Sequence, residues 1–209
     1  VMIFTAVIVE NGEEKGISAF VIEGDTEGMS LSPPEKKMGW CGSDTRSVFF
    51  KDMHIPTSAV LGNPSKGFKQ FLKTLTGGRI TIGALGLGTA QGAFARALEY
   101  SQEREAFGKS INNFQGVSFK LSDMATQIEA ARHLVYYAAW KKDQGLPVIR
   151  EAAMAKLFSS ETAMQVTTEA IQVLGGYGYI KEYDVERFFR DAKILEIGEG
   201  TSEIQRMII

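Results

Sequence analysis

The chain has 209 residues, of which 44% are hydrophobic, and this length is sufficient to bury a substantial core. Its 23 basic and 25 acidic residues give a net charge of -2, which argues against nucleic-acid or anionic-membrane binding as the main role. The single cysteine, Cys41, excludes an intramolecular disulfide framework and a cysteine-clustered zinc site. The single cysteine also makes a reducing compartment the default expectation, and since no apolar run reaches about 18 residues we expect a soluble protein.

The first 61 residues have the alternating pattern of β-strands. Asn11-Gly12 supplies the flexible turn that links neighbouring strands, and Pro33-Pro34 breaks a short strand. The expected strands lie within residues 2–9, 16–23, 29–35 and 45–56. Because the chain starts at Val1 inside a strand-like run and stops in the apolar MII, we expect it to be a fragment.

From Gly67 onward the apolar period changes from two toward 3.6, which predicts helices. Small residues in the first helix indicate close packing, and Gly175 is placed to end the third helix as a glycine C-cap. The expected helices are residues 67–103, 115–143, 148–174, 184–192 and 201–209. The predicted architecture is α+β, with part of an antiparallel β domain at residues 1–61 and a helical bundle at residues 62–209.

The segment REAFGKSINNFQ, residues 104–115, links the first two long helices. Arg104 beside an aromatic ring and the flexible Gly108-Lys109 pair suits a phosphate-bearing ligand, because arginine offers paired donors to phosphate oxygens. Charged residues at a helix end also simply meet solvent. Taken alone, the composition favours that second interpretation.

The segment QVLGGYGY, residues 172–179, offers backbone without side chains for close approach to a ligand. Taken alone, the segment favours the second interpretation, in which the glycines simply end a helix, and its context matches neither a Rossmann fingerprint nor a Walker loop. His54 and His133 lie in unrelated contexts, so the sequence predicts no metal site and no Ser-His-Asp arrangement.

The segment EIGEGTSEIQR places the carboxylate of Glu199 between Gly198 and Gly200. Glycines on both sides free the backbone and suggest a positioned, catalytic carboxylate. A carboxylate near a helix amino end, meeting free N–H groups and the positive dipole, is the other interpretation. The residues alone leave both open.

Together, ordered segments of this chain resemble the acyl-CoA dehydrogenase family. They are GWCGSDTRSVFFKDMHIP, GGRITIGALGLGTAQGAFARALEYSQEREAFGKSINNFQ, QVLGGYGYIKEYDVERFFRDAKI and IGEGTSEIQR, and the resemblance covers essentially the whole chain. It implies the second half of the family's central β domain and most of its C-terminal four-helix bundle, without the N-terminal helical domain. The similarity is to the short- and medium-chain, butyryl-CoA dehydrogenase-like branch. It implies that this polypeptide alone binds FAD poorly.

The resemblance assigns the chemistry to Glu199 as the base that removes the α proton of an acyl-CoA thioester. The β hydrogen then leaves as hydride to FAD, giving a trans-2-enoyl-CoA, as in fatty acid β-oxidation. Another branch carries its base at the position of Gly78, which has no side chain to ionise. The resemblance places Arg79 and Thr76 near CoA, with Thr76 standing where many relatives have Asp, and Gly200 beside the thioester.

The resemblance also implies an FAD site shared between subunits, and hence a homodimer or homotetramer formed through the bundle. The residues expected to reach the FAD of a neighbouring subunit are Arg104, Phe107, Gln115, Gln172, Leu174, Gly175 and Gly176. Thr201 and Glu203 are expected to meet the FAD of their own subunit.

The expected partners are acyl-CoA and an electron-transferring flavoprotein. The alternatives are an acyl-CoA oxidase that passes electrons to oxygen, and a non-catalytic helical module that only oligomerises. The bacterial cytoplasm, or the mitochondrial matrix in a eukaryote, is the expected compartment.

Overall fold

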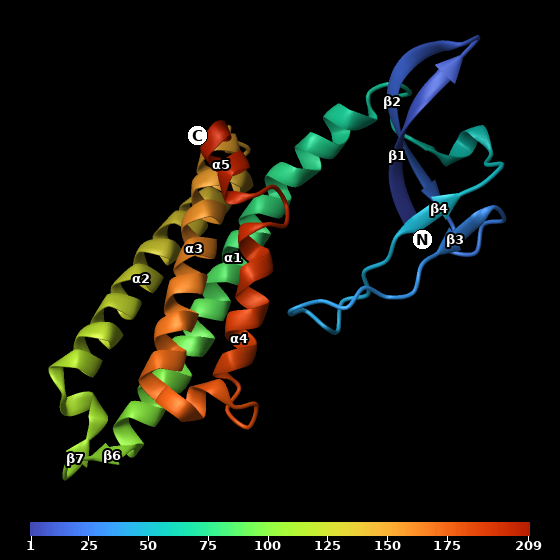
Figure 1. Ribbon diagram of the computed structural model, residues 1–209. Helices are drawn as coiled ribbons and strands as arrows, with labels where there is room; N and C mark the ends of the chain where they lie inside the picture. The colour runs from blue at the N-terminus through green and yellow to red at the C-terminus, as the bar shows by residue number, and fades with distance from the viewer. The chain divides into compact units, whose positions relative to one another are not determined.

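The computed structural model describes all residues, 1–209 (Figure 1). The chain forms two compact units. The first comprises Val1–Lys37 and Cys41–Leu75, and the second comprises Met38–Trp40 and Thr76–Ile209. None of the helices combines the length and hydropathy needed to cross a membrane.

The first unit is built on antiparallel strands. β1 (Met2–Glu10) pairs with β2 (Glu13–Ile22), and β2 pairs in turn with β5 (Val60–Leu61). β3 (Met29–Leu31) pairs with β4 (Val48–Phe50) in a separate small sheet. Asn11 and Gly12 have φ of 53° and 79°, the left-handed pair that a tight hairpin requires.

Two strand boundaries differ from the prediction. β2 begins at Glu13, three residues earlier than expected, because the two-residue turn lets pairing start immediately after it. Of residues 45–56, only Val48–Phe50 is strand. Asp52, with φ of 49°, interrupts the extended backbone there, so the alternating pattern beyond it does not continue the ladder.

The second unit is helical, and all the predicted helices are confirmed to within one or two residues. They are α1 (Gly67–Glu103, which begins in the first unit), α2 (Gln115–Asp143), α3 (Ile149–Leu174), α4 (Val185–Ala192) and α5 (Ser202–Ile208). Figure 1 shows α1 to α4 side by side, with α5 at one end of this bundle. A hairpin of β6 (Glu105–Ala106) and β7 (Lys109–Ser110) lies at the opposite end.

The glycines of α1 let neighbouring helices approach closely. A Cβ on Gly86 would lie 2.9 Å from the carbonyl oxygen of Ser159 on α3, and one on Gly92 would lie 2.7 Å from the Phe188 ring on α4. Added side chains would therefore separate the helices. The lost intrinsic helix propensity, about 1 kcal/mol per glycine, is offset by this packing.

One stripe of buried residues on α3 has members spaced alternately four and three residues apart. Its buried members are Ala152, Lys156, Ser159, Ala163, Val166 and Ala170. Steps of this kind place side chains on one face of a helix. The inclusion of a lysine in such a stripe is unusual, because lysine is almost never fully buried unless it is paired.

Candidate functional site

A left-handed turn carries Glu199 in the segment between α4 and α5. Glu199 has φ of 56° and Gly200 has φ of 91°. Positive φ is uncommon for a residue with a side chain, and such strain persists only where the surroundings hold it. The positive φ explains why glycine stands at position 200, where the Cβ of another residue would be disfavoured.

The carboxylate of Glu199 lies against the bare backbone of α1. A Cβ built on Gly78 would stand 2.6 Å from Oε2 and 3.2 Å from Cδ of Glu199. These distances are too short for any larger residue unless the carboxylate moves. The Glu199 residue itself is exposed in this chain, so its carboxylate is open to a ligand.

Two buried side chains donate hydrogen bonds to the backbone carbonyl oxygens of this turn. Lys156 donates from Nζ to the carbonyl oxygen of Gly200 at 2.8 Å. Gln205 donates from Nε2 to the same oxygen at 2.8 Å and to the carbonyl oxygen of Glu199 at 3.3 Å. Neither residue was predicted from the sequence. The position of Lys156 among the small and apolar residues of α3 does, however, indicate a buried lysine that needs a specific partner.

Arg79 and Thr76, the predicted CoA contacts, lie on α1 beside Gly78. Arg79 is only 6% exposed, and its Nε makes no hydrogen bond within the chain. Burial lowers the pKa of its guanidinium, and the negative charge of Glu199 opposes that shift. The structure thus brings Arg79 and Glu199 together at one end of the bundle.

Thr201 and Glu203 lie at the start of α5. Thr201 is the N-cap, and its Oγ1 accepts a hydrogen bond from the backbone N–H of Ile204 at 3.4 Å. Hydrogen bonds from its own backbone N–H and from Thr201 lower the pKa of Glu203. Both residues line a cavity of about 400 Å³ together with Glu161, Lys193, Glu196, Ile197 and Ser202.

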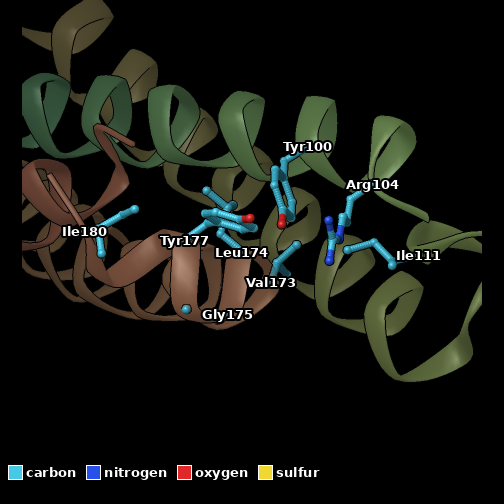
Figure 2. Close-up of a pocket in the computed structure, with 9 residues that line it drawn as sticks. Tyr100, Arg104, Ile111, Val173, Leu174, Gly175, Tyr177 and Ile180 are labelled. Carbon is cyan, nitrogen blue, oxygen red and sulfur yellow. The ribbon is translucent and has the colours of Figure 1, made fainter. Parts of the chain in front are cut away.

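A second cavity, of about 440 Å³, gathers several predicted cofactor contacts (Figure 2). Its lining comprises Tyr100, Arg104, Ile111, Val173, Leu174, Gly175, Gly176, Tyr177 and Ile180. Figure 2 shows Arg104 near Tyr100 at one side of this cavity, with the residues that end α3 opposite. Arg104, Leu174, Gly175 and Gly176 are therefore brought together, as members of one surface.

The chemistry of this second cavity combines a cation, aromatic rings and bare backbone. The guanidinium carbon of Arg104 lies 5.8 Å from the centre of the Tyr177 ring, within cation–π range. Gly175 has φ of 60°, and a Cβ on it or on Gly176 would meet nothing within 4 Å. Burial raises the pKa of the Tyr100 hydroxyl, with Arg104 opposing the shift.

The remaining predicted contacts lie outside that cavity lining. Phe107 is 97% exposed at the tip of the β6–β7 hairpin, with φ of 52°, next to Gly108 with φ of 79°. Gln115 is exposed at the first residue of α2, and Gln172 is exposed in the last turn of α3.

The two groups of residues lie far apart along α1, one beside Gly78 and the other just beyond Glu103. The 25 residue-to-residue steps from Gly78 to Glu103 span roughly 37 Å of helix axis, at ~1.5 Å per step. One chain therefore presents two separate surfaces rather than one continuous site.

Comparison with known proteins identifies the family. Residues 65–209 match the family model described as acyl-CoA dehydrogenase, C-terminal domain. A probable acyl-CoA dehydrogenase of Bacillus subtilis is 52% identical over 209 residues, which are 100% of this chain and 55% of that protein.

Solved structures show the same similarity. The three-dimensional structure of butyryl-CoA dehydrogenase from Megasphaera elsdenii is 49% identical, with a TM-score of 0.94 over 99% of this chain and 54% of that chain. A structure described as an electron transferring flavoprotein of Acidaminococcus fermentans is 47% identical, with a TM-score of 0.95 over 99% of this chain and 54% of that one. The chain spans about half the length of these relatives. It belongs to the acyl-CoA dehydrogenase family, whose C-terminal domain it carries at residues 65–209.

Proposed function

We propose that the protein carrying this chain is an FAD-dependent acyl-CoA dehydrogenase in which Glu199 removes the α proton. The observation that supports this role most strongly is the contact of the Glu199 carboxylate with the backbone of Gly78. A base must lie within hydrogen-bond reach of the proton that it removes. An exposed carboxylate that a strained turn holds against α1 is suited to this role for a thioester lying over α1.

The substrate is an acyl-CoA, because the thioester carbonyl acidifies the α carbon from which Glu199 takes the proton. The backbone beside Gly200 is suited to hold the thioester carbonyl, and Arg79 supplies a buried positive charge near the base. The family relationship favours short or medium acyl chains, as in the butyryl-CoA dehydrogenase relative.

The residues of the second cavity fit FAD. The Arg104 guanidinium suits a diphosphate, while the tyrosine rings and the bare Gly175 and Gly176 backbone suit a flat aromatic group. When bound, FAD supplies the acceptor for the β hydrogen as hydride. Phe107, Gln115, Gln172 and Leu174 would complete this side, and Thr201 and Glu203 would meet a second FAD at the other end.

A homo-oligomer follows from this proposal. Because roughly 37 Å of α1 separates the two groups, one FAD can be held by both only if they come from different chains. We therefore propose a dimer or tetramer assembled through the bundle.

Electron transfer to an electron-transferring flavoprotein is the proposed reoxidation route, as membership of the acyl-CoA dehydrogenase family implies. The bacterial cytoplasm is the proposed compartment, since the relatives compared here come from bacteria. An acyl-CoA oxidase is the second candidate, and a non-catalytic helical module is the third.

The test uses the complete, FAD-loaded protein and a panel of C4 to C16 acyl-CoAs. Anaerobic bleaching of the flavin, with enoyl-CoA formed and reoxidation by electron-transferring flavoprotein but only slowly by oxygen, is the expected result. Rapid peroxide formation in air would instead identify an oxidase. A protein that holds no flavin and reduces no dye with any acyl-CoA would overturn the enzyme proposal.

A further inference from the structure

A buried polar cluster lies beneath the Glu199 turn, and the proposed proton transfer does not itself use it. Lys156 and Ser159 contribute from α3, and Ser202 and Gln205 from α5, all of them 7% exposed or less. Lys156 is 0% exposed. Removing an ammonium group from water is costly unless its hydrogen bonds and charge are compensated, so this lysine requires a specific reason.

The hydrogen bonds of Lys156 point to that reason. Its Nζ and the Nε2 of Gln205 both lie 2.8 Å from the carbonyl oxygen of Gly200. A carbonyl oxygen has two lone pairs, so the two donors together saturate it. Because the donors come from different helices, they fix the direction of this carbonyl against the body of the bundle.

That carbonyl belongs to the residue that sets the position of the base. Gly200 and Glu199 form the left-handed pair, and a rotation of the peptide after Gly200 changes the path of the whole turn. The Glu199 carboxylate in turn packs against the backbone of Gly78, with Oε2 2.6 Å from the position that a Cβ would take there. Hydrogen bonds that fix the direction of the Gly200 carbonyl therefore also restrain the position of the Glu199 carboxylate.

The charges around Lys156 agree with this location. Burial lowers the pKa of its ammonium group, whereas the carboxylates of Glu196, Glu199 and Glu203 oppose that shift and Arg79 adds to it. Three carboxylates thus lie close enough to interact with one buried lysine, and one of them is the proposed base.

We propose that Lys156 is a positioning residue for proton transfer: together with Gln205 it clamps the Gly200 carbonyl and so holds the Glu199 carboxylate over Gly78. This inference rests on the proposed function. Lys156 touches no reacting atom in this account and acts only through the turn.

Lys156→Met in the complete, FAD-loaded protein tests the proposal, because methionine keeps much of the volume but removes the donor and the charge. We expect anaerobic flavin reduction by the best acyl-CoA to slow by about 10²-fold, the effect of a misplacement of about 1 Å. The dissociation constant for the enoyl-CoA product should change less than the reduction rate does, and FAD content should stay at the wild-type level. Substrate deuterated at the α carbon should show an isotope effect at least as large as in wild type, because proton removal is the step impaired.

The matched control is Lys120→Met, a lysine on α2 that is ion-paired with Glu169 of α3. It should reduce flavin like wild type. Equal reduction rates in the Lys156→Met, Lys120→Met and wild-type proteins would overturn the positioning role while leaving the proposed function standing. Failure of wild type to reduce flavin with every acyl-CoA would overturn the proposed function itself.

Gln205→Leu and Lys156→Gln keep the proposal testable if Lys156→Met folds poorly. Both donors act on one oxygen, so the Lys156→Gln/Gln205→Leu double variant should lose less rate than the product of the two single losses. Lys156→Gln, whose amide is a neutral donor, should retain more activity than Lys156→Met in any preparation that binds FAD. Independent, multiplicative losses would contradict a shared clamp.

Discussion

The carboxylate of Glu199 occupies the space that a side chain at position 78 would need, since the Cβ of any residue replacing Gly78 would lie 2.6 Å from Oε2. Although 121 residues separate them in sequence, the two positions form one contact. The absence of a side chain at Gly78 and the presence of the carboxylate at Glu199 are therefore two parts of the same arrangement.

Gly78→Ala should displace the Glu199 carboxylate and slow flavin reduction by about 10²-fold. Gly88→Ala is the matched control, because Gly88 lies on the same helix with nothing within 4 Å of its Cβ position. The control should keep the wild-type rate and gain up to about 1 kcal/mol in stability. Stopped-flow reduction and thermal melting of both variants measure these effects, and equal rates would contradict the packing argument.

Gly200→Ala should impair the turn, because an alanine at φ of 91° costs about 1–3 kcal/mol. The new Cβ would also lie 2.9 Å from Nε2 of Gln205, one of the two anchors. Gly198→Ala, whose Cβ would make an ordinary 3.4 Å contact, serves as the control. We expect flavin reduction to fall more in Gly200→Ala than in Gly198→Ala; the reverse order would show that the left-handed turn is dispensable.

Arg104→Lys should weaken FAD binding while leaving the fold intact, because Arg104 is exposed and lysine lacks the paired donors. Loss of a charged hydrogen bond, about 1.5–3 kcal/mol, predicts a dissociation constant for FAD about 10- to 100-fold higher. Arg96→Lys is the control, since that exposed arginine forms ion pairs only with Glu99 and Asp184. Titration of the apoprotein with FAD measures both constants, and unchanged affinity in Arg104→Lys would remove it from the cofactor site.

Glu151 should make stability dependent on pH in the acid range. Hydrogen bonding to Lys141 and to backbone, with a smaller effect from Arg150, lowers the pKa of Glu151 from 4.5 to about 2. The stabilisation that depends on its ionised form is therefore complete above about pH 4.5 and is lost as the pH falls through the folded-state pKa of about 2.

Glu151→Gln should accordingly be less stable than wild type at pH 7 and lose less stability between pH 4.5 and 2. Urea unfolding at steps of pH measures the difference, with Glu99→Gln on the exposed surface as the control. Parallel stability curves for wild type and Glu151→Gln would show that the contact of α2 with α3 through Lys141 and Glu151 carries no such pH dependence.

The long helices were predictable because each has many apolar residues at a period near 3.6, and errors at one position do not disturb such a pattern. The β6–β7 hairpin was not predicted, since each strand has only two residues and its turn is formed by Phe107 and Gly108 rather than by a typical Asn-Gly pair. Residues 45–56 show the opposite error, because an alternating pattern cannot reveal the positive φ of Asp52.

Local sequence marked Glu199 as unusual but left its role open, and only the resemblance made it a base. The anchors of its turn were less accessible still. Lys156 and the Gly200 carbonyl that it contacts are 44 residues apart, and nothing in either segment specifies the pairing. Contacts of this kind depend on how α3 and α5 pack, which periodicity alone does not determine.

The role of Glu199 as the base is tested by comparing wild type with Glu199→Gln in the complete, FAD-loaded protein under anaerobic conditions. Glutamine keeps the size of the side chain but cannot accept the α proton. We predict that the variant still binds enoyl-CoA and FAD, while the rate of flavin reduction by acyl-CoA falls by about 10²- to 10⁴-fold. Reduction of the variant's flavin at the wild-type rate would show that the base is another residue.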